Sequence, residues 1–493
     1  MKLPRLEHDC YHPHMIFEGI PFAHFYSPIR GGFQERAIYS ILNILERKLR
    51  VTIAFDANQI PFNRPELLDS FELAKKLKQS GVIASIVRAP HLADEPRIAQ
   101  WNAVCGDKRN NPVGGSAWKS DANALTAALA EALERYIWLE ERDYFVAPVQ
   151  ATHNVIQKYG ASIAPERFVA FSPEQREKNP GWRLDSSSTF LWTRGISLVS
   201  GNPTYVPAQT ITAVQDLGNS EEPLIRHRNT TGLATWPTQS GARLAGALEV
   251  VERDAYMIMW LNQLALPRIS LEGLCARSTT LSEFVGTCAR YRLKVHALQL
   301  LTDAPAHAVC VILEDESGHV PRFSFGMKAH RSLTHAVERA TTEALRARFS
   351  CRRQDLAGKR WDPSVSKSEV GHYDRILYWG APENAKKLEV LLQGKEIEVP
   401  LAEWENDTPD EHLQRIVSWC RDSGYECVSV SLGTSKKNPT PWSIEMVVIP
   451  ELQPMHLSEK FQQLGGERWK SVPQHFDITP REKPFTDEPH PFA

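Results

Sequence analysis

Residues 130–135 read Ala-Glu-Ala-Leu-Glu-Arg, and residues 248–253 read Leu-Glu-Val-Val-Glu-Arg. Each segment places two glutamates three residues apart, with an arginine directly after the second. On a helix, residues at this spacing share a face about one turn apart, so each segment presents two carboxylates on one side. A looser third copy follows, with Glu343, Arg346 and Arg348. From the two clear copies we expect two equivalent acidic helices that lie side by side around one site.

The rest of the chain predicts an α+β fold, in which groups of strands lie between a few long helices. Apolar residues at helical spacing predict long helices over about 122–139, 241–262 and 333–349. A Ser-Gly-Asn-Pro turn at 200–203 predicts a hairpin within 190–210. Further strands are expected at 308–313, 322–325, 426–432 and 442–449.

We divide the chain into three parts. Residues 1–95 are expected to form an N-terminal α/β extension of unassigned role, because a helical pattern at 67–78 precedes a β-branched run at 82–87. Residues 96–475 would form the main domain, which carries the three acidic helices. Residues 476–493 form a proline-containing tail.

Composition excludes several classes of protein. The chain has 493 residues, 42% of them hydrophobic, and a formal net charge of −2, which gives no electrostatic reason to expect nucleic acid as a partner. No apolar run reaches the length of a membrane span, and the N-terminus lacks the order of a signal peptide. Eight scattered cysteines without a CxxC pair indicate reduced thiols. We expect a cytoplasmic protein.

A single copy of the glutamate pattern is more often a solvated helix face than a site. Here, however, the pattern recurs, and the residues around both copies are apolar or small. Buried carboxylates require cations or hydrogen bonds, and Mg²⁺ prefers carboxylate and phosphate oxygens. The arginine behind each pair could donate to phosphate. Residue chemistry therefore favours a Mg²⁺–nucleotide site, although the chain has neither a Walker A loop nor a kinase-type glycine loop.

Several segments, taken in order, resemble the YcaO-type ATP-utilising enzymes over about residues 100–493. The matching segments are Ala128-Leu129-Ala130-Glu131-Ala132-Leu133-Glu134-Arg135-Tyr136, Thr231-Gly232-Leu233-Ala234, Glu249-Val250-Val251-Glu252-Arg253-Asp254-Ala255 and Ala340-Thr341-Thr342-Glu343-Ala344-Leu345-Arg346-Ala347-Arg348. The stretches 192–208 and 447–454 resemble the peptide-modifying branch of that family. The tail, Pro489-His490-Pro491-Phe492-Ala493, resembles the proline-rich terminus that its cyclodehydratases carry beside the active site.

The resemblance implies a YcaO-type fold with ATP and Mg²⁺ between two quasi-equivalent helices. The metal ions would be held by Glu131, Glu134, Glu249 and Glu252. The cofactor would also be contacted by Arg135, Arg253, Glu343, Arg346, Arg348 and Asn229, the arginines touching phosphates or bracing the carboxylates. For Asn229, a role in ordering its own loop is an equal alternative. Pro489, Pro491 and Ala493 are the catalytic candidates of the tail.

The implied reaction is cyclodehydration of Cys, Ser or Thr in a ribosomally synthesised precursor peptide. The side chain attacks the preceding carbonyl, ATP phosphorylates the resulting oxyanion, and loss of phosphate leaves a thiazoline or oxazoline. Such chemistry belongs to the biosynthesis of thiazole/oxazole-modified peptides, including bacteriocins. A separate leader-peptide-binding protein, a downstream flavin dehydrogenase and a homodimer are the implied partners.

Two alternatives stay open. The chain could form a thioamide or an amidine on a peptide backbone, or it could be a catalytically silent scaffold. The scaffold reading draws on departures from the family pattern at four positions: Ala127, Pro237, Gly241 and Arg346. All four metal-type glutamates are nevertheless present, which favours an active enzyme.

Overall fold

The computed structural model describes residues 65–106, 112–212, 222–227 and 229–492. The predicted extension therefore falls partly outside the described residues. Its helix and strand are present as α2 (Leu68–Gln79) and β1 (Ile83–Arg88). Because β1 pairs with β2 (Ala99–Cys105), the predicted boundary at residue 95 lies between two neighbouring strands of one sheet.

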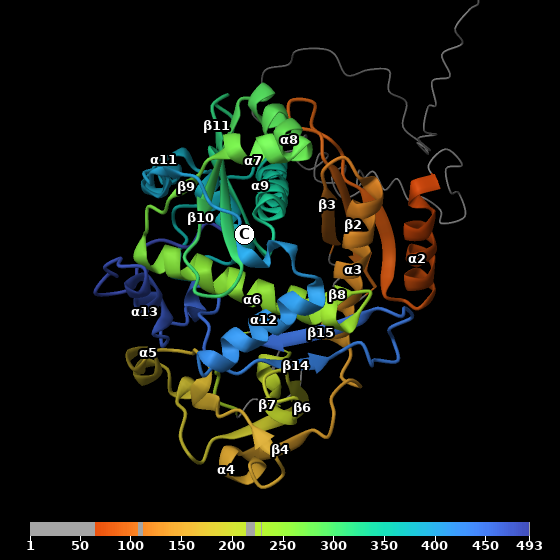
Figure 1. The fold of residues 1–493 in the computed structure, drawn as a ribbon, viewed down its shortest axis with the longest axis vertical. Coiled ribbons are helices and arrows are strands. Elements are labelled where there is room, and N and C mark those ends of the chain that lie inside the picture. The colour runs from red at the N-terminus through yellow and green to blue at the C-terminus, as the bar shows by residue number, and fades with distance from the viewer. Residues whose placement is uncertain (1–64, 107–111, 213–221, 228, 493) are drawn as a thin grey trace, which may run out of the picture. The chain divides into compact units, whose positions relative to one another are not determined.

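The described strands form three sheets (Figure 1). The three-stranded sheet has the order β1-β2-β3, where β3 is Pro112–Ala117. The five-stranded sheet has the order β12 (Phe323–His330), β11 (His307–Asp315), β10 (Leu293–Gln299), β9 (Arg268–Ile269), β13 (Glu396–Ile397). The seven-stranded sheet has the order β5 (Ala161–Ser162), β7 (Pro203–Pro207), β6 (Thr189–Ser197), β14 (Val428–Ser431), β15 (Ser443–Val448), β8 (Leu233–Trp236), with β4 (Val149–Thr152) paired to β6.

Three long helices organise these sheets: α3 (Asp121–Glu140), α6 (Gln239–Asn262) and α9 (Leu333–Leu356). Each begins directly after a Ser or Thr whose hydroxyl accepts a backbone N–H of the first turn, namely Ser120, Thr238 and Ser332. The other α-helices are α4 (His153–Ile156), α5 (Pro173–Lys178), α7 (Leu271–Arg277), α8 (Thr279–Arg290), α10 (His372–Gly380), α11 (Pro382–Ala385), α12 (Pro409–Asp422) and α13 (Arg468–His475).

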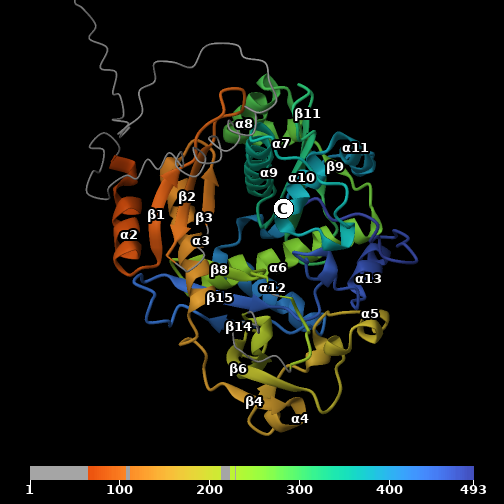
Figure 2. The same ribbon diagram turned by 180° about the vertical axis from the view of Figure 1, so that it is seen from behind.

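The long helices pack on different sheets. α3 lies against β2 and β3, with α2 at the outer edge beside β1 (Figure 2). α9 covers β11 and β12, and α6 contacts β12 of the five-stranded sheet as well as β15 and β8 of the seven-stranded sheet. Both α3 and α6 contact β8, so the two predicted glutamate helices meet at this strand. The predicted α+β class, the three helices and the hairpin are confirmed.

The contact between α9 and β12 is close enough to require glycine at position 326. A β-carbon added there would lie 2.0 Å from the Ala340 carbonyl oxygen and 2.5 Å from the Ala344 nitrogen, both helix backbone atoms. We expect Gly326→Ala to lower the free energy of unfolding by about 1–3 kcal/mol, as overpacked cores do.

Urea denaturation would measure this effect, with Gly286→Ala on α8 as the matched control. A β-carbon at residue 286 meets nothing within 4 Å, so that substitution should be neutral or slightly stabilising. Equal midpoints for both variants would contradict the close packing of α9 on β12.

Candidate active site

The α3 pair, Glu131 and Glu134, projects from the side of the helix that carries Arg135. The Arg135 guanidinium pairs with the Glu131 carboxylate, with Nη2 2.7 Å from Oε1. Glu134 is buried at 7% exposure, whereas Glu131 is half-buried. One carboxylate of the pair is therefore neutralised by its own helix, and the other lies deeper.

The α6 pair is held from two directions. Glu249 Oε2 accepts the Gly232 backbone N–H (2.9 Å), and Glu252 Oε2 accepts the Ala329 N–H (2.8 Å). Arg253 lies between the two carboxylates, donating from Nη2 to Glu249 (3.1 Å) and from Nη1 to Glu252 (2.8 Å). The positive φ of Gly232, +91°, and its close approach to the Val447 carbonyl leave room only for glycine at the residue that presents this N–H.

The third helix repeats this arrangement. Glu343 Oε2 accepts the Met327 N–H (2.8 Å), and Arg346 Nη2 lies 4.0 Å from Glu343 Oε1. Arg346 also donates to the Gly114 carbonyl (2.8 Å), which ties α9 to β3. Since β12 is the last strand of its sheet, the N–H groups of Met327 and Ala329 would otherwise be unpaired.

The same arrangement of contacts thus occurs at Glu249, Glu252 and Glu343. In each, a backbone N–H donates to one carboxylate oxygen, and an arginine lies near the other oxygen. The two oxygens are fixed in direction rather than free to rotate, which is how ligands of a cation are preorganised. Charges on the three helices act on one another. Arg346 of α9 and Arg253 of α6 lower the pKa of Glu131 on α3, and Glu343 of α9 raises the pKa of Arg253.

The carboxylates repel one another. Burial and the negative charge of Glu131 raise the pKa of Glu134 well above its usual value, with Glu249 adding to the rise and Arg135 opposing it. Burial also raises the pKa of Glu249, which Arg253 opposes and Glu252 reinforces. For Glu131, burial acts upward, but Arg135 brings the pKa below its usual value. Additional positive charge would relieve this repulsion.

The residues present fit a divalent cation together with phosphate. The metal-type donors are all carboxylate oxygens, the ligand type of a hard cation such as Mg²⁺. On the phosphate side, the buried Nε atoms of Arg253 and Arg226 have no hydrogen-bond partner among the described residues. Buried guanidinium groups with unused donors are suited to an anionic oxygen.

Two basic residues of this site were missed by the sequence analysis. Arg226 lies near Glu249, and burial lowers its pKa to about 10. Lys328 of β12 places Nζ 3.5 Å from Glu252 Oε2. Neither belongs to the repeated motif. The only sequence signal for Arg226 was its position shortly before Thr231 and Gly232, and Lys328 gave none.

Asn229 lies at the edge of the site and orders the loop that carries Arg226. Its Oδ1 accepts hydrogen bonds from the Thr231 N–H (3.1 Å) and from Arg226 Nη2 (3.0 Å). Of the two roles considered for Asn229, the structure shows the contacts that order its loop. Direct contact of Asn229 with the cofactor stays a prediction.

Arg348 lies away from the acidic site, contrary to the prediction of a phosphate contact. Its guanidinium is buried and pairs with Glu95 (2.8 Å) and Asp315 (2.5 Å), while Nη1 donates to the Pro321 carbonyl. The physical reason is helical periodicity, because Arg348 lies five positions after Glu343 and therefore on a different side of α9. Arg348 thus forms ion pairs with the carboxylates of Glu95 and Asp315, and these do not belong to the site.

The C-terminal tail contacts the site through Phe492. The Phe492 ring lies 4.9 Å from the Arg253 guanidinium carbon, and the Pro489 carbonyl accepts from Trp379 Nε1 (3.1 Å). Pro489 and Pro491 are buried. Ala493 lies outside the described residues, and a catalytic role for the three predicted tail residues stays a prediction.

Two of the four positions that differ from the family pattern, Gly241 and Arg346, have a local structural explanation. A β-carbon at Gly241 would lie 2.1 Å from the Trp236 ring, so glycine at the start of α6 accommodates this tryptophan. Arg346 donates to β3, as described above. Ala127 is half-buried one turn before Glu131, and Pro237 is exposed ahead of the α6 cap. Nothing in the structure explains these last two.

The chain is similar to several proteins of known structure. A search of curated proteins found no match. Among solved structures, the chain is similar to a heterocyclase in complex with substrate and cofactor, with 21% identity, a TM-score of 0.67, and coverage of 85% of this chain and 57% of the other. This chain therefore spans little more than half of that heterocyclase.

Two further structures share the fold. The YcaO from Methanopyrus kandleri bound with AMPPCP and Mg²⁺ is 16% identical, with a TM-score of 0.53 and coverage of 78% of this chain and 90% of that one. A chain of the E. coli microcin synthetase McbBCD complex is also 16% identical, with a TM-score of 0.53 and coverage of 75% and 88%.

A family model described as "YcaO cyclodehydratase", ATP- and Mg²⁺-binding, matches residues 118–453. The matched stretch includes α3, α6 and α9 with all of their glutamates. It makes up well over half of the chain. The chain therefore belongs to the YcaO family of ATP- and Mg²⁺-binding cyclodehydratases.

Proposed function

We propose that this chain is an ATP-dependent peptide heterocyclase that converts Cys, Ser or Thr of a precursor peptide into a thiazoline or oxazoline. The observation that carries the proposal is the convergence of glutamates from three helices with arginines that keep unused donors. Similarity to solved heterocyclases supports the substrate class, because it shows that the chain has their fold.

In this proposal Glu131, Glu134, Glu249 and Glu252 hold Mg²⁺, and Arg135, Arg253, Arg226 and Arg346 face the phosphates. ATP would supply a phosphoryl group that turns the amide oxygen into a leaving group. The protein's own part is positioning and charge neutralisation, since phosphoryl transfer requires little covalent help. Fixed carboxylates and guanidinium groups need no reorganisation as negative charge develops in the site.

The same proposal includes a precursor peptide as substrate, a separate leader-binding protein and a downstream flavin dehydrogenase, acting in the cytoplasm. The microcin synthetase McbBCD, one chain of which is similar in fold to this protein, is a complex. None of the helices in the described part of this chain is long and apolar enough to cross a membrane.

Mass spectrometry tests the reaction type directly. The protein would be incubated with ATP, Mg²⁺ and synthetic peptides that each carry one Cys, Ser or Thr after a carbonyl labelled with heavy oxygen. We expect products one water lighter per ring, and release of the label in inorganic phosphate. Glu249→Gln serves as the inactive control.

Other outcomes separate the alternatives. In a parallel incubation to which sulfide is added as the sulfur donor, exchange of oxygen for sulfur in the product would indicate thioamide formation. Unchanged peptides, together with wild-type protein that does not bind Mg²⁺–ATP, would contradict an enzyme and favour a scaffold.

A further inference from the structure

The C-terminal tail is fastened residue by residue to the body of the domain. Glu488 pairs with Lys367 (2.6 Å) and Lys387 (2.9 Å). Next along the chain, the Pro489 carbonyl accepts from Trp379, and the His490 and Phe492 side chains are buried. This continuous series of contacts indicates a fixed position rather than a loosely lying terminus.

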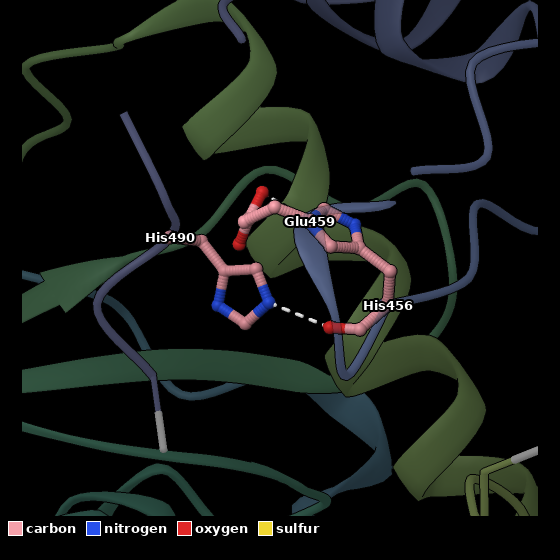
Figure 3. A group of neighbouring side chains, drawn as sticks. All are labelled: His456, Glu459 and His490. Carbon is pink, nitrogen blue, oxygen red and sulfur yellow. Dashed lines mark hydrogen bonds and ion pairs between the residues drawn. The ribbon is translucent and has the colours of Figure 1, made fainter. Parts of the chain in front are cut away.

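His490 is the most deeply placed of these anchors, with no exposed surface. Its Nε2 donates to the His456 carbonyl at 2.8 Å, and its ring contacts the His456 ring edge-on at 4.7 Å between centroids (Figure 3). The Tyr256 ring of α6 lies on another side at 5.9 Å. The surface that contacts His490 is therefore formed by α6 and the segment 456–459.

An ion-pair network of His456, Glu459 and Arg375 lies beside His490. His456 Nε2 lies 2.9 Å from Glu459 Oε2, and Arg375 Nη2 donates to Glu459 Oε1 at 2.7 Å. Burial, followed by the nearby Arg375 and His456, lowers the pKa of His490 well below its usual value. A protonated imidazole would face the Arg375 guanidinium, so the neutral form is favoured at this position.

His456, Glu459 and His490 also bring three metal-ligand atoms within 4.8 Å of one another. A metal ion is nevertheless a poor occupant of this site. Arg375 already pairs with Glu459, so a second cation would sit beside a buried guanidinium. His456 would also have to give up its bond to the carboxylate. The geometry points to a hydrogen-bonded anchor rather than a metal centre.

The anchor is connected to the acidic site through Phe492. Only Pro491 separates His490 from Phe492, and the ring of Phe492 lies over the Arg253 guanidinium at 4.9 Å while contacting Tyr256 at 5.8 Å. Arg253 is the residue that bridges Glu249 and Glu252. An aromatic face over a desolvated guanidinium restrains its orientation.

We propose that His490 is a positioning residue, which fixes the tail so that Phe492 holds Arg253 in register with Glu249 and Glu252. The inference rests on the proposed function in one respect, because it assigns Arg253 to the nucleotide site. Substrate does not have to touch His490 for this role.

The test measures two properties of each variant. Hydrogen exchange of the peptide covering 486–492 reports whether the tail is fastened, and calorimetric titration with a slowly hydrolysed ATP analogue and Mg²⁺ reports the site. We expect His490→Ala to accelerate exchange in the tail and to weaken analogue binding about tenfold, with unchanged exchange in α6. Phe492→Leu should weaken binding similarly while leaving exchange slow at Glu488.

Conservative variants add a readout that a purely structural role would not produce. His490→Gln can place an amide donor where Nε2 lies and should recover most of the affinity, whereas His490→Asn places it where Nδ1 lies and should not. Asp487→Asn, in the exposed side chain next to the anchors, is the matched control and should behave as wild type.

Wild-type affinity and slow tail exchange in His490→Ala would overturn the proposal, as would one equivalent of tightly bound metal that is lost in this variant. If wild-type protein fails to bind the analogue, the proposed function fails. The exchange measurement then still decides whether His490 fastens the tail.

Discussion

Replacing Glu249 with glutamine is expected to weaken Mg²⁺-dependent binding of an ATP analogue by about 100-fold or more, since a metal ligand is lost. The substitution keeps the side-chain volume and the acceptor for the Gly232 N–H, so the fold should persist. It removes a negative charge that faces Glu252 and Glu134. Glu131→Gln should have the same effect from the opposite helix.

Calorimetric titration with and without Mg²⁺ measures this loss. Glu272→Gln on α7, an exposed glutamate outside the site, is the matched control and should bind as wild type. Equal, Mg²⁺-dependent affinity in wild type and Glu249→Gln would show that the nucleotide does not use the α6 carboxylates.

The second large effect is expected at Arg348, and it concerns stability instead of binding. Replacement by methionine leaves the buried Glu95 and Asp315 carboxylates with fewer partners. Breaking a buried ion pair from one side costs about 3–5 kcal/mol. Arg352 still pairs with Glu95, which places the expected loss at the lower end of that range.

Arg346→Met is the matched comparison, because the two arginines are two positions apart on the same helix. Arg346 is more exposed, so its loss should change the unfolding midpoint little and weaken nucleotide binding instead. Thermal unfolding and calorimetry on both variants would separate the two roles. A destabilised Arg346→Met beside a stable Arg348→Met would show that the assignments are reversed.

The sequence pattern predicted most of the fold because its signals are local. Helix-capping Ser and Thr residues, apolar spacing and the hairpin turn each act within a few residues. The recurring Glu-x-x-Glu-Arg motif also predicted that α3 and α6 meet at one site. Each of these expectations depends on the period of a single helix.

The remaining features depend on contacts between distant segments. Arg226 and Lys328 join the site through a loop and an edge strand that no motif marks. Arg348 shares the motif of its neighbours but points elsewhere, because its partners Glu95 and Asp315 come from other parts of the chain. The meeting of His456 and His490, 34 positions apart, likewise follows from where the tail lies.

We propose that Mg²⁺ and ATP lie among the glutamates of α3 and α6. The most direct test of this proposal is anomalous diffraction from crystals grown with Mn²⁺ and a slowly hydrolysed ATP analogue. We expect Mn²⁺ density bounded by Glu131, Glu134, Glu249 and Glu252, with phosphate density beside Arg253. Nucleotide bound elsewhere, or Mn²⁺ held only by other side chains such as His456 and Glu459, would contradict it.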